Sequence, residues 1–281
     1  MHPLTRALDP AHLSALTART EGRPDLVVGV VDGAVDPGHP DLALQPTRFV
    51  GAPIPGRDPG SPPGHGTLVV SSLAARPTAP TPGICPGCSF VVRPVPGVDV
   101  PPAAPVDLAY ALADVVTAGA RVVNLSLALQ RLPIAGPADD PGIGMLLDTV
   151  ELARRHGVVV VAAAGNDGEL GGPPLVRHPW VVPVVACDDE GQPLPTSTLG
   201  RAIGRHGLTA PVLPHELSGT SAAAPVVTGA VALLWSLFPG ASAEAVRDAV
   251  TRPRSRARRT SVVPPLLDAA YAYEVLRDVS A

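Results

Sequence analysis

The chain has 281 residues, of which 46% are hydrophobic and 16% charged, a balance typical of a folded globular protein and not of a disordered one. Its formal net charge is −4 and all 21 basic residues are arginine, which argues against the broad cationic face of a nucleic-acid-binding protein. A chain of this length can bury a sizeable core in one large domain.

The N-terminal residues lack the apolar core that follows a basic start in a secretory signal. No apolar run approaches the roughly 20 residues needed to cross a bilayer. Three cysteines, Cys85, Cys88 and Cys187, are too few for a disulfide framework in a chain of this size. We therefore expect a cytoplasmic protein with no membrane partner.

Five valine-rich runs predict strands that are buried on both faces, as in a parallel sheet. They are residues 26–32, 89–95, 120–127, 157–164 and 180–187. Helical periodicity is found at residues 65–75, 106–118, 142–156, 221–237, 243–250 and 266–278. The alternation predicts an α/β fold with a central, mostly parallel sheet flanked by helices. We expect a short N-terminal segment, residues 1–24, followed by a single domain, residues 25–281.

The first predicted strand ends at Asp32, which is followed directly by Gly33. In an open parallel sheet, functional groups gather beyond the carboxyl ends of the strands, so Asp32 is well placed for a site. The alternative is that this Asp-Gly pair only forms a turn.

The second candidate is His65, which stands between two glycines at the start of a helix of small residues. Glycines let other backbone segments approach closely and leave one face of the imidazole open, as a general base requires. A single histidine is otherwise usually structural or solvated, and the flanking glycines make this one a candidate base.

Two more polar residues follow apolar elements in the second half of the chain. Asn166 comes after the strand at 157–164, where its amide could donate to a tetrahedral oxyanion, although an Asn-Asp-Gly turn is the alternative. Ser221 stands at the start of an apolar helix, whose first N–H groups are unpaired and carry the positive end of the helix dipole. The alternative for Ser221 is a simple N-cap.

In their order and sequence context, Asp32, His65, Asn166 and Ser221 resemble the subtilase family of serine peptidases, and the resemblance extends from about residue 25 onward. It implies a three-layer subtilisin-like fold, with residues 25–281 as the catalytic domain. It also implies that Ser221 attacks the scissile carbonyl, that His65 transfers the proton and that Asp32 orients the imidazole. Asn166 and the Ser221 backbone N–H would receive the oxyanion.

The resemblance also implies a cleft for an extended peptide. Residues 122–127 look like the family's substrate-binding edge strand, on which the peptide would pair as an added strand. The implied substrate-binding residues are Leu125, Ser126, Leu127, Ala128, Ala163, Ala164, Gly165, Asp167, Gly219 and Thr220. Since the implied pocket walls are small and apolar and Asp167 stands at their rim, we expect a medium-sized apolar P1 side chain with a minor tolerance for Arg or Lys.

No metal and no cofactor are expected. Many secreted subtilases carry an Asn/Asp-rich calcium loop after the histidine helix, whereas residues 76–88 of this chain offer almost no side-chain oxygen ligands. Cys85 and Cys88 in this stretch form a CPGC element, which is too little for a four-ligand zinc site. A redox dithiol is one alternative for the pair, and ordinary buried or turn cysteines are the other.

Residues 14–40 and 83–95 look most like the PatA-like proteases, which mature cyanobactins by clipping leader segments from ribosomally made precursor peptides. This resemblance implies intracellular processing of a precursor peptide by an acyl-enzyme mechanism. Two alternatives stay open, a general intracellular subtilisin for protein turnover and an inactive subtilase that binds an extended peptide as a scaffold.

Overall fold

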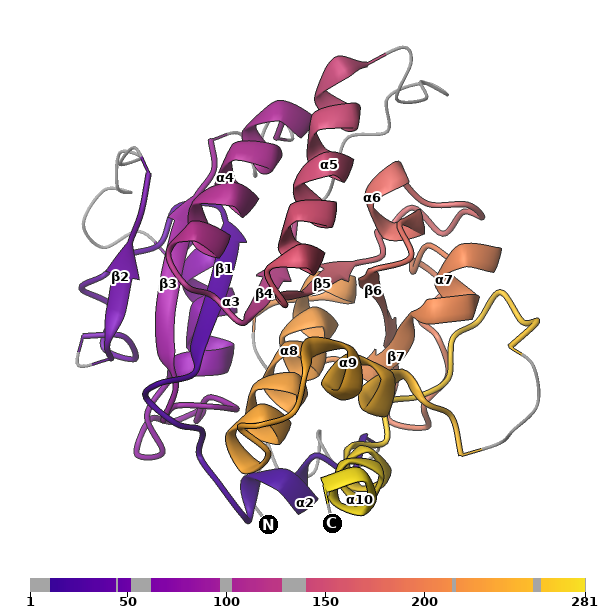
Figure 1. Cartoon of the computed structure of the whole chain (residues 1–281). Coiled ribbons are helices and arrows are strands. Elements are labelled where there is room, and N and C mark those ends of the chain that lie inside the picture. Colours follow the sequence, from indigo (N-terminus) through magenta and orange to yellow (C-terminus); the bar gives the residue numbers. More distant parts are fainter. Residues whose placement is uncertain are drawn as a thin grey trace.

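The computed structural model describes residues 11–43, 45–51, 62–96, 103–127, 140–213, 216–254 and 259–280. Its centre is a seven-stranded sheet with the strand order β2-β3-β1-β4-β5-β6-β7 and parallel pairing throughout (Figure 1). The strands are β1 (Val27–Asp32), β2 (Thr47–Phe49), β3 (Ser89–Pro94), β4 (Val122–Leu125), β5 (Val159–Ala163), β6 (Val181–Cys187) and β7 (Leu208–Pro211). The predicted α/β fold is confirmed.

Helices cover both faces of this sheet (Figure 1). One face is covered by α4 (Pro105–Thr117) and α5 (Pro141–Arg155), and the other by α3 (His65–Ala74) and α8 (Gly219–Leu237). Two short helices, α6 (Pro174–Arg177) and α7 (Arg201–His206), pack against β6. The helices α2 (Ser14–Thr17), α9 (Ala243–Thr251) and α10 (Ala269–Ser280) lie against α8.

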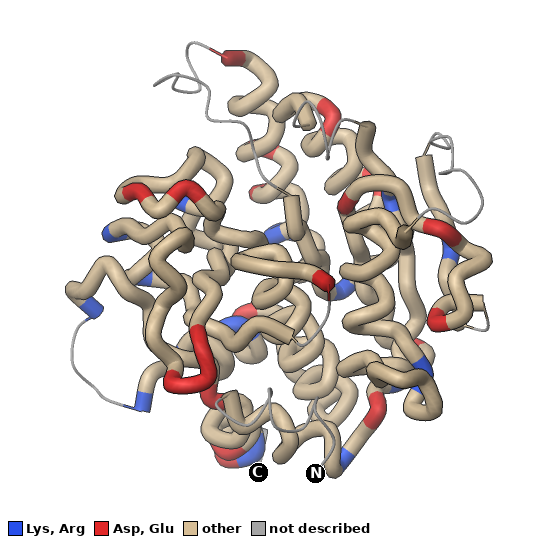
Figure 2. The backbone as a smooth tube through the Cα atoms, turned by 180° about the vertical axis from the view of Figure 1, so that it is seen from behind, with Lys and Arg blue, Asp and Glu red and all other residues tan. Residues whose placement is uncertain are grey.

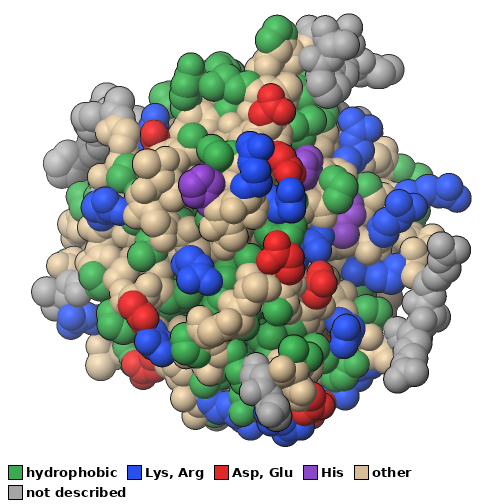
Figure 3. Space-filling model, in the orientation of Figure 1, with side chains coloured by type: hydrophobic (Ala, Val, Ile, Leu, Met, Phe, Trp, Pro, Cys, Tyr) green, Lys and Arg blue, Asp and Glu red, His purple; other side chains and the backbone are tan. Residues whose placement is uncertain are grey.

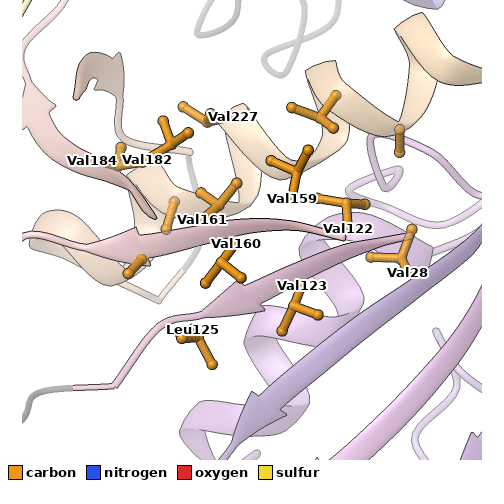
Figure 4. Packing of buried hydrophobic residues seen from close by; sticks show 14 of the residues in the cluster. Val28, Val122, Val123, Leu125, Val159, Val160, Val161, Val182, Val184 and Val227 are labelled. Carbon is orange, nitrogen blue, oxygen red and sulfur yellow. The ribbon is translucent and has the colours of Figure 1, made fainter. Parts of the chain in front are cut away.

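Side chains of the central strands fill both layers. Figure 4 shows Val159 and Val161 of β5 on the side of α8, where Val227 lies, and Val160 on the opposite side. All four of these valines are fully buried. Because a parallel strand covered on both faces needs apolar side chains at every position, this packing explains the uninterrupted valine runs of the sequence.

The predicted boundaries lie within two residues of the observed ones, except for the last helix. That helix was predicted over 266–278 but begins at Ala269, because the Leu267 N–H donates to the Thr209 carbonyl and extends the sheet instead. Asp268 then accepts the Tyr271 N–H at 3.0 Å and starts the helix. The two edge strands, β2 and β7, were not predicted, since three or four residues make no recognisable apolar run.

One prediction about the sheet is wrong. Residues 122–127 do not form an edge strand, because β4 lies between β1 and β5 and its backbone groups are paired on both sides. Only the chain beyond Leu125 can therefore pair with a peptide. Ser126 and Leu127 form the described part of this extension, and Ala128 lies outside the described residues.

Figures 2 and 3 show acidic and basic positions interspersed around the fold.

Within the described ranges, α8 is the one helix long and apolar enough to span a membrane, but 89% of its apolar stretch is buried inside the protein. In this structure α8 is a core helix.

The three cysteines are buried and free. The hydrogen bond with Cys88, together with burial, raises the pKa of Cys85 well above its ordinary value. Burial raises the pKa of Cys187 to about 12. Because a neutral buried thiol is a poor nucleophile, these shifts favour the interpretation of Cys85 and Cys187 as small core residues, whereas the hydrogen bond with Cys85 lowers the pKa of Cys88.

Candidate active site

Three neighbouring strands end at the same edge of the sheet. β1, β4 and β5 lie side by side and run parallel, so their carboxyl ends meet. Asp32 ends β1, Ser126 follows β4, and Asn166 comes shortly after β5. The carboxyl edge of a parallel sheet is where ligands bind in open α/β folds, so this edge is the candidate site.

Asp32 and His65 form a hydrogen-bonded pair at this edge. Asp32 Oδ1 lies 2.7 Å from His65 Nδ1 and also accepts the Gly33 N–H at 2.7 Å. The Asp32 side chain is completely buried, whereas 26% of the His65 side chain is exposed. A buried carboxylate at Nδ1 favours the tautomer that carries its proton there, which makes Nε2 the basic nitrogen.

The pair forms because α3 packs closely on the loop after β1. A Cβ atom at Gly66 would lie 2.5 Å from the Gly33 carbonyl oxygen, a distance that no ordinary side chain tolerates. Glycine next to the histidine therefore permits the approach that brings His65 to Asp32. This is the role that the sequence suggested for one of the two flanking glycines.

Ser221 lies in the first turn of α8, which begins two residues earlier than predicted, at Gly219. Its hydroxyl donates to the Ser126 carbonyl at 3.0 Å, and the Ser126 hydroxyl donates to the Ser221 carbonyl at 3.1 Å. We refer to these two hydrogen bonds as the Ser126–Ser221 clamp. The clamp joins the extension of β4 to the start of α8.

The Asn166 side chain is oriented by the same first turn. Its Oδ1 accepts the Thr220 N–H at 2.9 Å and the Thr220 hydroxyl at 3.1 Å. Because the oxygen is occupied on the helix side, the amide NH₂ is left to donate elsewhere. Gly219, with φ of +60°, is required for this approach, since a Cβ atom there would overlap Asn166 Oδ1.

The other predicted substrate-binding residues gather at the ends of β4 and β5. Those that are buried are Leu125, Ser126, Leu127, Ala163 and Ala164. Gly165 is half-buried, and its N–H donates to the Thr220 hydroxyl at 3.3 Å. Asn166 and Asp167 are exposed. The structure thus brings these segments to one edge.

Sequence reasoning missed two polar residues that lie behind the clamp. Thr228 in α8 donates to Asn124 Oδ1 in β4 at 2.8 Å, and Asn124 Nδ2 donates to the Ser126 hydroxyl at 2.8 Å. Both residues are fully buried. A signal for each residue was present, though not for their pairing, because both are polar residues inside apolar runs and buried polar groups are nearly always hydrogen-bonded.

Metal ligands do not cluster in the part of the chain that the structure describes. There, no group of three or more His, Cys, Asp or Glu side chains is arranged so that it could hold a metal ion. The expectation that the protein binds no metal stays a prediction.

Comparison with known proteins gives consistent matches over most of the chain. A family model described as the subtilase family, Peptidase_S8, matches residues 23–263. Subtilisin DY from Bacillus licheniformis is 30% identical over 237 residues, which cover 79% of this chain and 80% of that protein. Some other subtilisins match over only 58% of their own length.

Solved structures match more of the chain. The prenylagaramide maturation protease PagA has a TM-score of 0.79 and 29% identity, over 94% of this chain and 98% of PagA. The patellamide maturation protease PatA has a TM-score of 0.74 and 28% identity, over 92% of this chain and 98% of PatA.

Proposed function

Because the chain belongs to the subtilase family and is a serine-type endopeptidase, we propose that Ser221 is its nucleophile, His65 its general base and Asp32 the residue that orients His65. The observation that carries this assignment is the buried Asp32–His65 pair, with 2.7 Å between Oδ1 and Nδ1. The pair lies at the carboxyl edge of the sheet, to which the clamp ties the start of α8.

In the proposed reaction, the Ser221 hydroxyl turns from the Ser126 carbonyl toward His65 Nε2. The oxygen attacks the scissile carbonyl while His65 takes the proton, and His65 then gives this proton to the leaving amine. Water hydrolyses the resulting acyl-enzyme by the same route. Asp32 stays ionised and stabilises the imidazolium.

The oxyanion would be held by two donors. One is Asn166 Nδ2, whose partner atom Oδ1 is fixed by Thr220. The other is the Ser221 N–H, one of the first four helical N–H groups, which lack an intrahelical partner. Loss of one such donor costs about 2.7–4 kcal/mol of barrier stabilisation, a magnitude measured in subtilisin itself.

The substrate peptide would lie along the extension of β4, and its P1 side chain would enter the region between residues 125–127 and 163–165. Burial of a Leu- or Met-sized side chain contributes roughly 1.5–3 kcal/mol. An ion pair with the exposed Asp167 contributes only about 0–1 kcal/mol. The larger contribution decides, so we propose an apolar P1 preference with minor tolerance for Arg or Lys.

Cleavage of a peptide library by the wild type and by Asp167→Asn tests this preference. We expect Asp167→Asn to weaken cleavage after Arg and Lys by up to about fivefold and to leave cleavage after Leu unchanged. A strict requirement for a basic P1 residue in the wild type would contradict the ranking of the two effects.

For the biological role we propose processing of a ribosomally made precursor peptide in the cytoplasm. The support is the likeness to two proteases described as maturation proteases, PagA and PatA, over 98% of each of those chains. The free cysteines fit a reducing compartment.

The test compares two substrates for the purified protein. One is a ribosomally made precursor peptide that carries a leader segment, and the other is unfolded casein. A processing protease cuts the precursor at one bond and leaves casein largely intact. Degradation of casein at many bonds would instead identify a general turnover protease, and cleavage of neither substrate would favour a peptide-binding scaffold.

A further inference from the structure

The backbone carbonyl of Ser221 lacks its usual α-helical donor. In an α-helix this carbonyl would accept the N–H of the residue four positions later, but that residue is Pro225, which has no N–H. The Ser126 hydroxyl supplies the missing hydrogen bond at 3.1 Å. A buried side chain from β4's extension thus replaces a helical donor at the residue proposed as nucleophile.

The Ser126 hydroxyl has a single proton, and its neighbour Asn124 determines where that proton goes. Asn124 Nδ2 donates to Ser126 Oγ at 2.8 Å, so the serine oxygen serves as acceptor there and its proton is left for the Ser221 carbonyl. With the amide turned over, Asn124 Oδ1 would compete for the same proton. The orientation of the Asn124 amide therefore decides whether the clamp has two hydrogen bonds or one.

Thr228 completes the hydrogen bonds of the amide in this orientation. Its hydroxyl donates to Asn124 Oδ1 at 2.8 Å, and both residues are fully buried. Because its proton occupies Oδ1, the amide NH₂ donates to Ser126 and the Ser126 proton reaches the Ser221 carbonyl, whereas a turned amide would leave that carbonyl without this donor. The donors thus run in one direction, from Thr228 through Asn124 and Ser126 to the Ser221 carbonyl, and each group in such a buried chain depends on the one before it.

We propose that Thr228 and Asn124 are positioning residues that act on Ser221 through Ser126. The inference rests on the proposed role of Ser221 as nucleophile. With the donor chain intact, the backbone of Ser221 stays fixed to β4 while its hydroxyl turns toward His65, and its N–H keeps its place for the oxyanion. A misplacement of about 1 Å at such a site can lower the rate by 10²-fold.

The test measures the second-order rate of labelling by a fluorophosphonate, which reacts with an activated serine without occupying an extended peptide cleft. Thr228→Val keeps the side-chain shape and removes the hydroxyl, and we expect it to slow labelling by roughly 10- to 100-fold. Thr228→Ser restores the donor and should restore most of the rate. All rates are taken per folded molecule, well below the melting temperature of every variant.

Ser236→Ala is the matched control. Ser236 is a buried hydroxyl on the same helix, and it donates to the Ala232 carbonyl. Its removal should leave the labelling rate at the wild-type value. An equal loss in this control would mean that any buried hydroxyl of α8 matters only through stability, and the proposal would fail.

The route through Ser126 is tested by a double-mutant cycle. Ser126→Ala should slow labelling by itself, and Thr228→Val should then add no further loss. Independent, multiplying losses would overturn the proposed route. Thr228→Ala gives the same comparison if Thr228→Val does not fold, because alanine suits a helix interior.

Two failures are distinguishable. If the wild type is labelled and Thr228→Val is labelled equally fast, this inference is wrong and the proposed function stands. If the folded wild type is not labelled at all, the proposed function is wrong and the inference falls with it.

Discussion

The two ends of α8 differ in where their polar groups find partners. At the first end, the Thr220 N–H donates to Asn166 Oδ1, 54 residues away in sequence, and the Ser221 hydroxyl donates to the Ser126 carbonyl, 95 residues away. Each of these hydrogen bonds joins two separate segments of the chain. The first, N-terminal end of the helix therefore connects segments that are distant in the sequence.

At the last, C-terminal end, the acceptors to which the side chains donate are local. The Ser236 hydroxyl donates to the Ala232 carbonyl, four residues before it, and Trp235 Nε1 donates to the Ala241 carbonyl, six residues after it. These two hydrogen bonds stay within one helix and the turn that follows it.

The two kinds of hydrogen bond should have different roles, one in the geometry of the active site and the other in the stability of the fold. Hydrogen bonds between distant segments fix the relative positions of reacting groups, whereas local ones mainly lower the free energy of the folded state. Substitutions at the first end of α8 should therefore impair the reaction and spare the fold. Substitutions at the last end should do the reverse.

Ser221→Ala should give the largest effect of all. We expect turnover to fall by a factor on the order of 10⁶, the loss known for this change in subtilisin. The melting temperature should stay near the wild-type value, because α8 is held by its buried apolar side chains. Steady-state kinetics and thermal unfolding by circular dichroism provide both numbers, and substantial residual turnover would refute the role of Ser221.

Asn166→Ala tests the residue that accepts the Thr220 N–H at the first end. We expect kcat to fall by about 10²- to 10³-fold, as found for the oxyanion donor of subtilisin, with little change in KM. The hydrogen bond from Asn166 to the oxyanion would form only in the transition state, so its loss should lower kcat. If KM rose and kcat stayed constant, Asn166 would be a ground-state binding group instead.

Trp235→Phe is the matching test of the last end. The change leaves the Ala241 carbonyl without its donor and removes the indole ring that Arg121 covers at 4.3 Å. We expect the free energy of unfolding to fall by about 1–3 kcal/mol, since the site is buried. Denaturant titration measures this loss, and a kcat that fell with it would mean that the two ends are not separable.

His206→Gln should have the smallest effect at neutral pH and extends the comparison to the helices packed on β6. Burial lowers the pKa of His206 from 6.5 to about 4. Folding therefore favours neutral His206. The stability that depends on this neutral form is fully present above pH 6.5 and is lost as the pH falls toward about 4, because the unfolded chain then binds a proton more readily than the folded protein does. Glutamine can still donate to the Val176 carbonyl, which His206 Nε2 meets at 3.3 Å, but cannot become charged.

Melting temperatures of wild type and His206→Gln between pH 7 and pH 4 provide the measurement. The wild type should lose more stability than the variant across this range. Part of the loss should remain in the variant, because burial lowers the pKa of His178 as well. Identical slopes for the two proteins would show that His206 is not responsible.

Much of the fold could be predicted because each central strand is buried on both faces and therefore consists of consecutive apolar residues, which are visible in the sequence. The edges could not, since β2 has two exposed residues out of three and β7 is only four residues long. The assignment of residues 122–127 as an edge strand came from the family resemblance, whereas their apolar run had predicted a strand buried on both faces, as β4 is.

The residues of the candidate site could be predicted where they belong to a short sequence motif, as His65 does between its glycines. It was not predictable where a hydrogen bond joins distant residues. The bond from Thr228 to Asn124 spans 104 residues, and no local pattern encodes such a pairing. Gly219 illustrates the same limit. A side chain at this position would overlap Asn166, which lies in another segment, so the sequence around Gly219 does not show why glycine is required.

The most direct test of the account is to map the site of fluorophosphonate labelling on the folded wild-type protein. The account predicts a single adduct on Ser221, absent from Ser221→Ala. Labelling should slow as the pH falls from about 7.5 to about 5, because protonated His65 cannot accept the serine proton. An adduct on another serine, or a rate at Ser221 that does not change with pH in this range, would contradict it.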